Sequence, residues 1–185
     1  RAGRQSAGKQ SLRNDPFECM YTRTTGIWQT VWMEAVAPTA IKRVKYTTDI
    51  DRSAVTMEFT MRRNAVGDVL TINVKDGAKV VATDTAPVAS GSIVTLPIKK
   101  AKLWSPESPF LYDVELILKN AAGQVIDKVD SYFGMRKIHT VGNKIYLNNE
   151  PYYQRLVLDQ GFYPDGIWTA PSDAALKKDI ELSMA

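Results

Sequence analysis

The sequence has one cysteine and one histidine among its 185 residues, and this scarcity excludes several kinds of chemistry. A single cysteine, Cys19, cannot form an internal disulfide framework. Cys19 and His139 together supply too few soft ligands for a tetrahedral zinc site. A nucleophile activated by histidine would depend wholly on His139, which lies in a strand-like stretch and is interpreted as an ordinary surface or core residue. We therefore expect no metal ion and no cofactor.

The sequence also lacks long apolar runs and any excess of charge on its body. No stretch is long enough to span a bilayer, so we expect a soluble protein with no membrane partner. Arg1, Arg4, Lys9 and Arg13 precede any acidic residue, and the remaining residues carry 20 basic against 20 acidic side chains. Nucleic-acid binding requires a basic face on the folded part, so we expect no nucleic-acid partner. The chain starts with Arg rather than Met and shows no signal peptide, so we expect it to begin inside a longer protein, with the compartment, bacterial cytoplasm or periplasm, left undetermined.

The beginning of the chain has two contrasting segments. Residues 1–15 are mostly Gly, Ser, Gln, Arg and Lys and predict a loop or mobile arm. Residues 21–36 are rich in β-branched and aromatic side chains, which predicts a strand after a bend at Gly26 and before Pro38. Trp28 and Trp32 are expected on one face of that strand.

The middle of the chain, from Ile41 to about Ile138, alternates apolar and polar residues in short stretches separated by turn residues. This pattern predicts an all-β fold, an antiparallel immunoglobulin-like sandwich. Residues 55–62 form the clearest strand, a turn at 64–68 leads to a strand at 70–75, and Asp76-Gly77 marks a hairpin, so we expect consecutive strands to pair. Residues 112–119 and 125–133, joined by a turn at 120–123, predict a second hairpin.

The character of the sequence changes at Lys144. Residues 144–154 predict a small hairpin that turns at Asn148-Asn149, and an extended stretch at 155–158 and a loop at 159–171 follow. Ser172 is a helix N-cap, and the apolar residues that recur every four positions predict a helix after it: Leu176, Ile180 and Met184. A strand, a loop and a helix in this order indicate the opening of a β/α unit.

Three segments, in order, resemble glycoside hydrolase family 2, the group of β-galactosidases, β-glucuronidases and β-mannosidases. They are Thr25-Gly26-Ile27-Trp28-Gln29-Thr30-Val31-Trp32-Met33-Glu34; Leu103-Trp104-Ser105-Pro106 through Tyr112 with Phe133-Gly134-Met135-Arg136-Lys137-Ile138; and residues 144–179. The resemblance implies that residues 1–37 end a sugar-binding jelly-roll domain, that 38–138 form the immunoglobulin-like domain, and that 139–185 begin a catalytic (β/α)₈ barrel.

The resemblance also implies where the chemistry lies. Retaining glycosidases use two carboxyl groups about 5–5.5 Å apart, and in this family both are Glu on later barrel strands. We therefore expect no catalytic residue here and no hydrolysis by this chain alone. Where the family reads Arg-Gly-Val-Asn-x-His, this sequence has Leu158 for the Asn and Gln160 for the His. The candidate substrate-binding residues are Arg155, Asp159 and Gln160, and each also has a structural interpretation.

Other residues are interpreted as structural. Tyr163 and Trp168 have faces that can stack on a sugar, but packing of their loop is favoured. Trp104 is expected to anchor a turn, and Asp113 and Glu115 to be solvated on an open sheet face. The leading hypothesis is a non-catalytic scaffold in a β-galactosidase-like enzyme, acting on a β-linked glycoside together with the other domains of its chain. The alternative is a free-standing immunoglobulin-like carbohydrate-binding or adhesion module, and a homo-oligomer is left open.

Overall fold

The structure, a computed structural model, describes residues 8–27, 29–63 and 65–185. Two compact units divide the chain: one is Ala35–Gln154, and the other combines the described residues before Ala35 with Arg155–Ala185. The predictions for residues 1–7, Trp28 and Asn64 lie outside the described residues. No helix in the described part of the chain is long and apolar enough to cross a bilayer.

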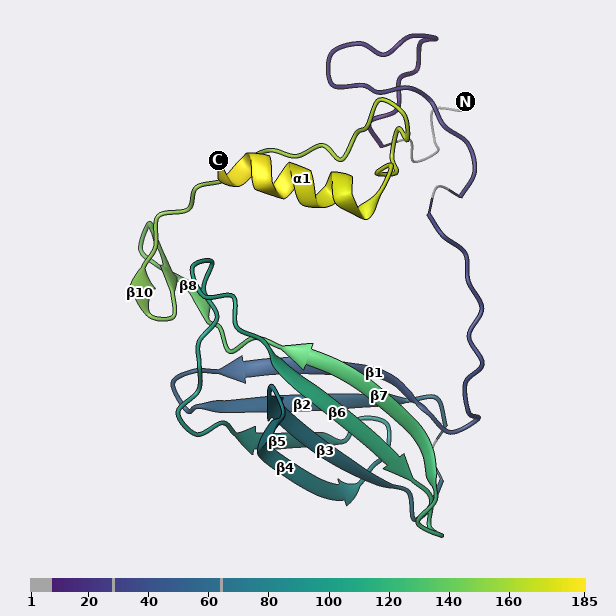
Figure 1. The fold of residues 1–185 in the computed structure, drawn as a ribbon, viewed down its shortest axis with the longest axis vertical. Coiled ribbons are helices and arrows are strands. Elements are labelled where there is room, and N and C mark those ends of the chain that lie inside the picture. Colours follow the sequence, from purple (N-terminus) through teal and green to yellow (C-terminus); the bar gives the residue numbers. More distant parts are fainter. Residues whose placement is uncertain (1–7, 28, 64) are drawn as a thin grey trace. The chain divides into compact units, whose positions relative to one another are not determined.

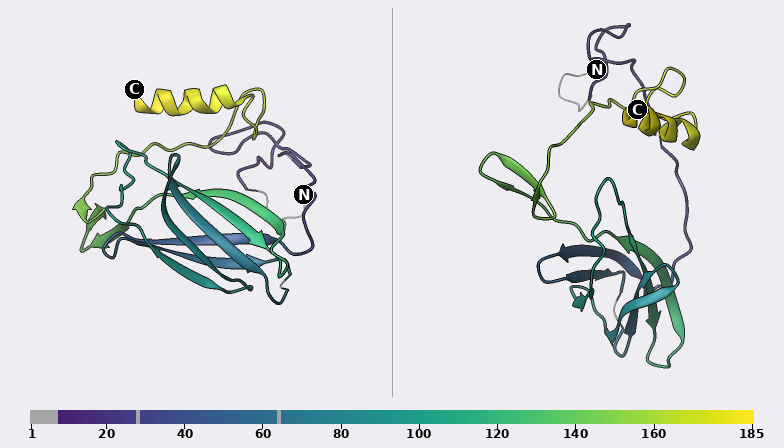
Figure 2. Two further views of the ribbon diagram at one scale, coloured as in Figure 1. Left: turned by 60° about the horizontal axis from the view of Figure 1, so that its bottom comes forward. Right: turned by 60° about the vertical axis from the view of Figure 1, so that its left-hand side comes forward.

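The larger unit is built on two antiparallel sheets that face each other (Figures 1 and 2). The first sheet has the order β1-β2-β5 and contains β1 (Ile41–Asp49), β2 (Ala54–Met61) and β5 (Ile93–Pro97). The second has the order β4-β3-β6-β7 and contains β3 (Val69–Asp76), β4 (Lys79–Pro87), β6 (Tyr112–Lys119) and β7 (Val125–Phe133). The predicted all-β fold, an immunoglobulin-like antiparallel sandwich, is confirmed.

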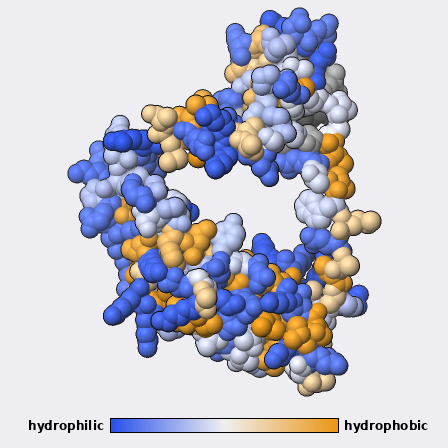
Figure 3. All heavy atoms as spheres, viewed as in Figure 1, coloured by the Kyte–Doolittle hydropathy of each residue, from blue (hydrophilic) through white to orange (hydrophobic). Residues whose placement is uncertain are grey.

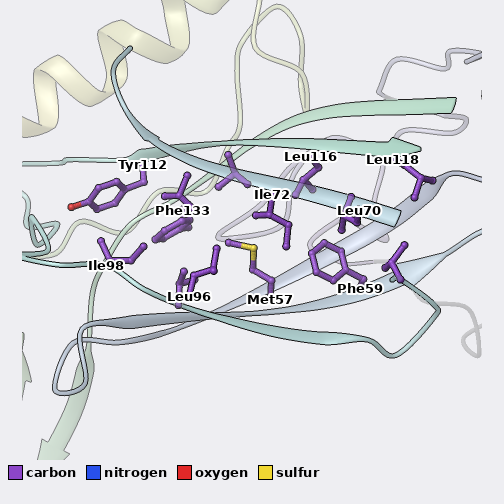
Figure 4. Close-up of a cluster of buried hydrophobic side chains, with 14 of the residues drawn as sticks. Met57, Phe59, Leu70, Ile72, Leu96, Ile98, Tyr112, Leu116, Leu118 and Phe133 are labelled. Atoms are coloured by element: carbon purple, nitrogen blue, oxygen red, sulfur yellow. The ribbon is translucent and has the colours of Figure 1, made fainter. Parts of the chain in front are cut away.

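The core lies between the two sheets because each central strand places alternate side chains on its inner face. Along β2 the inner residues are fully or almost fully buried, and β3 and β6 follow the same alternation. Figure 4 shows Met57, Phe59 and Leu96 from one sheet meeting Ile72 and Leu116 from the other. The Tyr112 hydroxyl in this cluster accepts from the Lys102 amide at 2.8 Å. The close packing of the apolar side chains is the main source of the unit's stability.

The expected pairing of consecutive strands is right at two places and wrong at one. β3 pairs with β4 across Gly77, whose φ is +58°, and β6 pairs with β7 across a turn that contains Gly123 at φ +77°. β2 and β3, in contrast, lie in different sheets, since β2 pairs with β1 and β5. Alternation shows which face of a strand is buried but not which strand lies beside it. Two strands that bury the same kind of face can therefore belong to opposite layers.

A small three-stranded sheet follows the sandwich. It contains β8 (Ile138–Val141), β9 (Lys144–Leu147) and β10 (Glu150–Pro151). The predicted turn at Asn148-Asn149 joins β9 to β10, and both residues adopt left-handed backbone angles, with φ of +53° and +71°. Asparagine tolerates this conformation better than most residues, which explains the choice of residues.

Side-chain contacts hold this small sheet on the sandwich unit. The Asn148 amide donates to the Trp104 carbonyl at 2.9 Å, and the Asn148 side-chain oxygen accepts from the Lys137 amide at 3.1 Å. The Asp51 carboxylate accepts from Lys137 Nζ at 2.5 Å and from the Asn149 amide at 2.7 Å. These two donors hold the pKa of Asp51 below its ordinary value. Trp104 therefore anchors a turn, as the sequence predicts, and its ring also packs under the Arg136 guanidinium.

Residues 29–37 form no strand, so the strand predicted between the bend at Gly26 and Pro38 is wrong for its described part. Among the described residues, no main-chain hydrogen bond joins 29–37 to another segment, and a strand without a neighbour leaves its backbone groups to water. Val31 and Met33 are accordingly exposed, at 73% and 98%. Figure 3 shows that apolar residues (orange) lie at the surface among hydrophilic ones (blue).

The helix predicted after Ser172 is confirmed as α1 (Asp173–Met184). The Ser172 hydroxyl accepts from the Ala175 amide at 3.2 Å, which satisfies one of the free donors in the first turn. The domain boundaries inferred from the resemblance, with a sandwich over 38–138 between the end of a jelly roll and the start of a barrel, stay a prediction.

Candidate functional site

The three candidate substrate-binding residues lie in one stretch of the smaller unit, just before α1. Residues 152–162 form no strand, although an extended first barrel strand is expected there. No strand of the described chain lies alongside to supply hydrogen bonds, and Leu156 and Leu158 are exposed at 79% and 87%. The stretch is therefore positioned by local contacts and not by a sheet.

The candidates differ in how much of each side chain is already engaged. Asp159 Oδ1 accepts from the Gly161 amide at 2.7 Å, which forms a local turn, and Oδ2 has no hydrogen-bond partner among the residues that the structure describes. Gln160 Oε1 accepts from Lys9 Nζ at 2.5 Å, so its amide group keeps two donors for other contacts. Arg155 is exposed and forms no side-chain hydrogen bond or ion pair with any described residue.

Two open grooves flank this stretch. A groove of about 460 Å³ is lined by Asp159, Gln160 and Phe162 on one side and by Asp179 and Ser183 of α1 on the other. A second groove, of about 620 Å³, is lined by Arg155, Asp159 and the apolar side chains of α1. Asp159, Tyr163 and Asp179 border both grooves. The structure thus brings all three candidates to these grooves: Asp159 lines both, Gln160 lines the first and Arg155 lines the second.

Tyr163 and Asp179 form the contact shared by the two grooves. The Tyr163 phenol donates to Asp179 Oδ2 at 2.9 Å, which ties the loop to α1. This hydrogen bond to a carboxylate, reinforced by its negative charge, raises the pKa of Tyr163 above the ordinary value. Tyr163 is therefore occupied within the unit, in agreement with the packing interpretation.

An aromatic cluster closes the loop on its other side. Tyr21 stacks on Phe162 with ring centroids 4.4 Å apart and planes 14° from parallel. Trp168 meets both rings edge to face, at 5.5 Å from Tyr21 and 6.0 Å from Phe162. Such arrangements suit the charge distribution of aromatic rings. Packing therefore accounts for Trp168 as well.

The contributions of Lys9 and Tyr21 were not predicted from the sequence. The Tyr21 amide donates to the Lys9 carbonyl at 2.7 Å, and the Ser11 amide donates to the Tyr21 carbonyl at 2.7 Å. These bonds hold the described part of the predicted N-terminal loop in a definite path. Lys9 precedes Gln160 by 151 residues, and no spacing in the sequence links the two.

The grooves contain two carboxylates, Asp159 and Asp179, but not the pair that glycoside hydrolysis requires. A general acid is kept protonated by burial in an apolar pocket, whereas both of these residues are exposed. Each also has one oxygen engaged in a local hydrogen bond. No group of three His, Cys, Asp or Glu residues within the described ranges is arranged to hold a metal ion.

Glu115, expected to be solvated, is instead the centre of an ion-pair cluster on the outer face of the four-stranded sheet. Its carboxylate lies 2.9 Å from Lys128 Nζ and 3.2 Å from Lys75 Nζ, and it accepts from the Asn73 amide at 3.1 Å. Hydrogen bonds from Lys128, Asn73 and Lys75 hold the pKa of Glu115 at about 2. The side chain is only 18% exposed because strand neighbours on both sides cover it. Asp113 is exposed, as predicted.

Replacing Glu115 with glutamine is expected to lower the thermal midpoint at neutral pH, with the difference from the native chain shrinking as the pH falls. An unperturbed Glu has a pKa of about 4.3, and in the folded chain the value is about 2. The stabilisation is therefore complete above about pH 4.3 and is lost on titration down to about pH 2, since the unfolded chain binds the proton first. Thermal unfolding followed by circular dichroism across this range measures the effect.

Asp113→Asn is the matched control, because Asp113 lies two residues away on the same face of β6 and has no ion-pair partner among the described residues. Its difference from the native chain should stay nearly constant over the same pH range. Equal pH profiles for the two variants would show that the cluster around Glu115 does not form in solution.

Sequence comparison identifies the family to which the sandwich is similar. Residues 39–136 match the profile of Glycosyl hydrolases family 2. The β-galactosidase large subunit of Leuconostoc lactis is 33% identical over 93 residues, which cover 49% of this chain and 14% of that protein. The β-galactosidase of Halalkalibacterium halodurans is 26% identical over 137 residues, which cover 70% of this chain and 14% of that protein. The chain thus spans a small part of the length of these relatives.

Structure comparison finds the same architecture in larger proteins. The β-glucuronidase of Ruminococcus gnavus, solved in complex with D-glucaro-d-lactam, superposes with a TM-score of 0.66 over 81% of this chain and 25% of that protein. The sequence identity is 19%, so this likeness concerns the fold.

Proposed function

Because the chain belongs to glycosyl hydrolase family 2, we propose that it is a non-catalytic scaffold portion of an enzyme that hydrolyses terminal β-glycosidic bonds. In this proposal, residues 1–37 end a jelly-roll domain, 38–138 form the sandwich, and 139–185 begin the catalytic barrel. The two catalytic glutamates then belong to later barrel strands. The observation that carries the proposal is the family match over the sandwich, in a chain that spans only 14% of its first relatives.

The proposed role of the sandwich is to position its neighbours. Catalytic rates depend on placement of reacting groups to within about 1 Å, so a spacer between domains must be stiff. The continuous apolar core between the two sheets supports such stiffness. The small sheet that precedes Arg155 in the chain is held to the sandwich by the contacts of Asn148, Asn149 and Lys137, so the stiffness extends to this sheet.

The proposed substrate contacts are Arg155, Asp159 and Gln160. Arg155 has its whole guanidinium available to orient a carboxylate or a hydroxyl group. Asp159 Oδ2 can accept from a sugar hydroxyl, and the Gln160 amide can donate to one while Lys9 holds its oxygen. The relatives are named as β-galactosidases and β-glucuronidases, so we propose a terminal β-galactoside or β-glucuronide as the substrate class.

A free-standing binding or adhesion module is not favoured. Such a module would end near residue 138, whereas the likeness to the β-galactosidase of Enterobacter cloacae extends over 86% of this chain at 25% identity. The hairpin after residue 138 is also tied to the sandwich through Asn148.

The purified 185-residue chain should release no chromophore from nitrophenyl β-galactoside or β-glucuronide above a blank. In the longer protein that contains this sequence, Arg155→Ala should lower kcat/KM at least about tenfold, which corresponds to the loss of one charge-assisted contact in the transition state. Arg52→Ala is the matched control, because Arg52 is an exposed arginine on the sandwich whose guanidinium lies 3.8 Å from Asp49.

Two results would contradict the proposal. Hydrolysis by the 185-residue chain that disappears in Asp159→Asn or Asp179→Asn would place the catalytic site here. An unchanged kcat/KM in the Arg155→Ala enzyme would remove this residue from substrate binding while leaving the scaffold role in place.

A further inference from the structure

A hollow of about 690 Å³ opens on the sandwich where β1 begins and β2 ends, and three basic side chains line it. These are Lys42, Arg62 and Arg63. The rest of the wall comes from Thr60, Met61 and the apolar stretch 36–38, and no acidic side chain is among the lining residues. All of these residues belong to the sandwich unit.

The basic residues converge because of a β-bulge. Ile41 pairs with Met61 and Arg43 pairs with Thr60, so Lys42 is an extra residue on β1 with no partner on β2. A bulge redirects the side chain at that position, and bulges are frequent beside functional sites. The Arg62 amide donates to the Ala40 carbonyl at 2.9 Å, which keeps the backbone after β2 alongside the start of β1.

Within the described ranges, no acidic side chain neutralises these three charges. The side chains of Lys42, Arg62 and Arg63 form no hydrogen bond or ion pair with any described residue. Two acidic residues on neighbouring strands have other partners: Asp127 Oδ2 of β7 accepts from the Ile41 amide at 2.8 Å, and Glu58 of β2 lies 3.8 Å from Lys45 Nζ. Like charges brought together without a counterion repel one another, so the arrangement is suited to an anionic ligand.

We propose that this hollow is a binding site for an acidic oligosaccharide, with Arg62, Arg63 and Lys42 contacting its carboxylate or sulfate groups. Two guanidinium groups match the planar oxygens of such anions, and the lysine adds a point charge. The volume falls within the range of small-molecule sites, about 300–1,000 Å³. The apolar wall formed by Val36, Ala37 and Pro38 offers a surface to the CH groups of a sugar ring.

The geometry favours a glycan over the other polyanions. A nucleic acid is read along a basic stripe that follows its phosphates, whereas these basic residues converge on one hollow with an apolar wall. A free inorganic ion has no apolar groups that could contact that wall. The inference rests on family membership and on the sandwich alone. It can therefore be wrong while the substrate contacts proposed for Arg155, Asp159 and Gln160 are right, and the reverse.

Calorimetric titration of the 185-residue chain at low ionic strength tests the inference with a heparin tetrasaccharide and a galacturonic acid tetramer, and with neutral cellotetraose as the comparison. We expect binding of an acidic tetramer and none of cellotetraose. Lys42→Gln/Arg62→Gln/Arg63→Gln should weaken the affinity at least about tenfold, or about 1.4 kcal/mol, because the charge-assisted contacts to the anionic groups are lost. The three side chains are exposed and their mutual repulsion is removed, so the thermal midpoint should not fall.

Lys79→Gln/Lys99→Gln/Lys119→Gln removes the same charge from exposed positions outside the hollow and should bind like the native chain. Equal weakening in both triple variants would reduce the effect to net charge and overturn the inference. So would equal affinity for cellotetraose or for a single-stranded DNA of similar charge. Displacement of the tetramer by sodium sulfate at the same molar concentration would show a simple anion site instead.

Discussion

Replacing Phe59 with alanine is expected to lower the free energy of unfolding by about 3–5 kcal/mol, the range for large aromatic residues in well-packed cores. Phe59 is completely buried, and it lies where β2 meets the facing sheet (Figure 4). Truncation removes the apolar contacts of the ring and leaves a cavity that rigid strands on both sides cannot close. Urea unfolding followed by tryptophan fluorescence measures the change.

Tyr132→Ala is the matched control for this substitution. Tyr132 is an aromatic residue on β7 of the same sandwich, but it is 64% exposed, so its removal should cost less than about 1 kcal/mol. If Phe59→Ala also cost less than about 1 kcal/mol, the two sheets would not enclose a close-packed core, and the stiffness on which the scaffold proposal depends would be lost.

The position of Phe59 could be predicted because burial along a strand is a local property. Val55, Met57, Phe59 and Met61 alternate with polar residues, and all four are buried in the structure. The period of two is set by backbone geometry alone. The same reasoning located the hairpin turns at Gly77 and Gly123, where a positive φ is needed. Features that depend only on near neighbours in the sequence are therefore read reliably from it.

Pairing between segments is different, because it depends on residues that are distant in the sequence. The pattern in residues 70–75 predicts a strand but does not reveal that β3 lies between β4 and β6. Likewise, residues 29–37 have the composition of a strand and form none, because no neighbour supplies hydrogen bonds. Amino-acid composition indicates a preference for extended backbone, but a strand forms only where a neighbouring strand can pair with it.

In the candidate site, too, some features could be predicted from the sequence and others could not. The stretch from Arg155 to Gln160 was identified through its resemblance to the family's Arg-Gly-Val-Asn-x-His segment, and the structure places all three candidates at two adjoining grooves. Lys9 contacts Gln160, whereas Tyr21 and Asp179 contact the neighbouring loop residues Phe162 and Tyr163. No local pattern in the sequence connects these partners. Glu115 was misread for a similar reason, since its partners Lys75 and Lys128 lie on the two neighbouring strands.

Gly166 is the residue in the candidate site whose replacement by alanine should have the largest effect. A Cβ atom at this position would lie 1.7 Å from the Thr169 carbonyl oxygen, a distance that two non-bonded atoms cannot adopt. Gly166 also closes a turn, because its carbonyl accepts from the Thr169 amide at 3.0 Å. Within this turn Tyr163 and Ile167 exchange two backbone hydrogen bonds, each of 2.9 Å.

Gly166→Ala must therefore open the turn and move Trp168 away from Tyr21 and Phe162. We expect the amides of Tyr163 and Ile167 to exchange with deuterium at least about thirtyfold faster, which corresponds to a local loss of about 2 kcal/mol. The indole NMR signal of Trp168 should also shift, while amides of β2 and β6 keep their rates, because they belong to the other unit. Asp165→Ala is the control, since Asp165 is an exposed neighbour in the same turn. Unchanged exchange in Gly166→Ala would mean that the turn closes in another way and that the groove residues are not held by it.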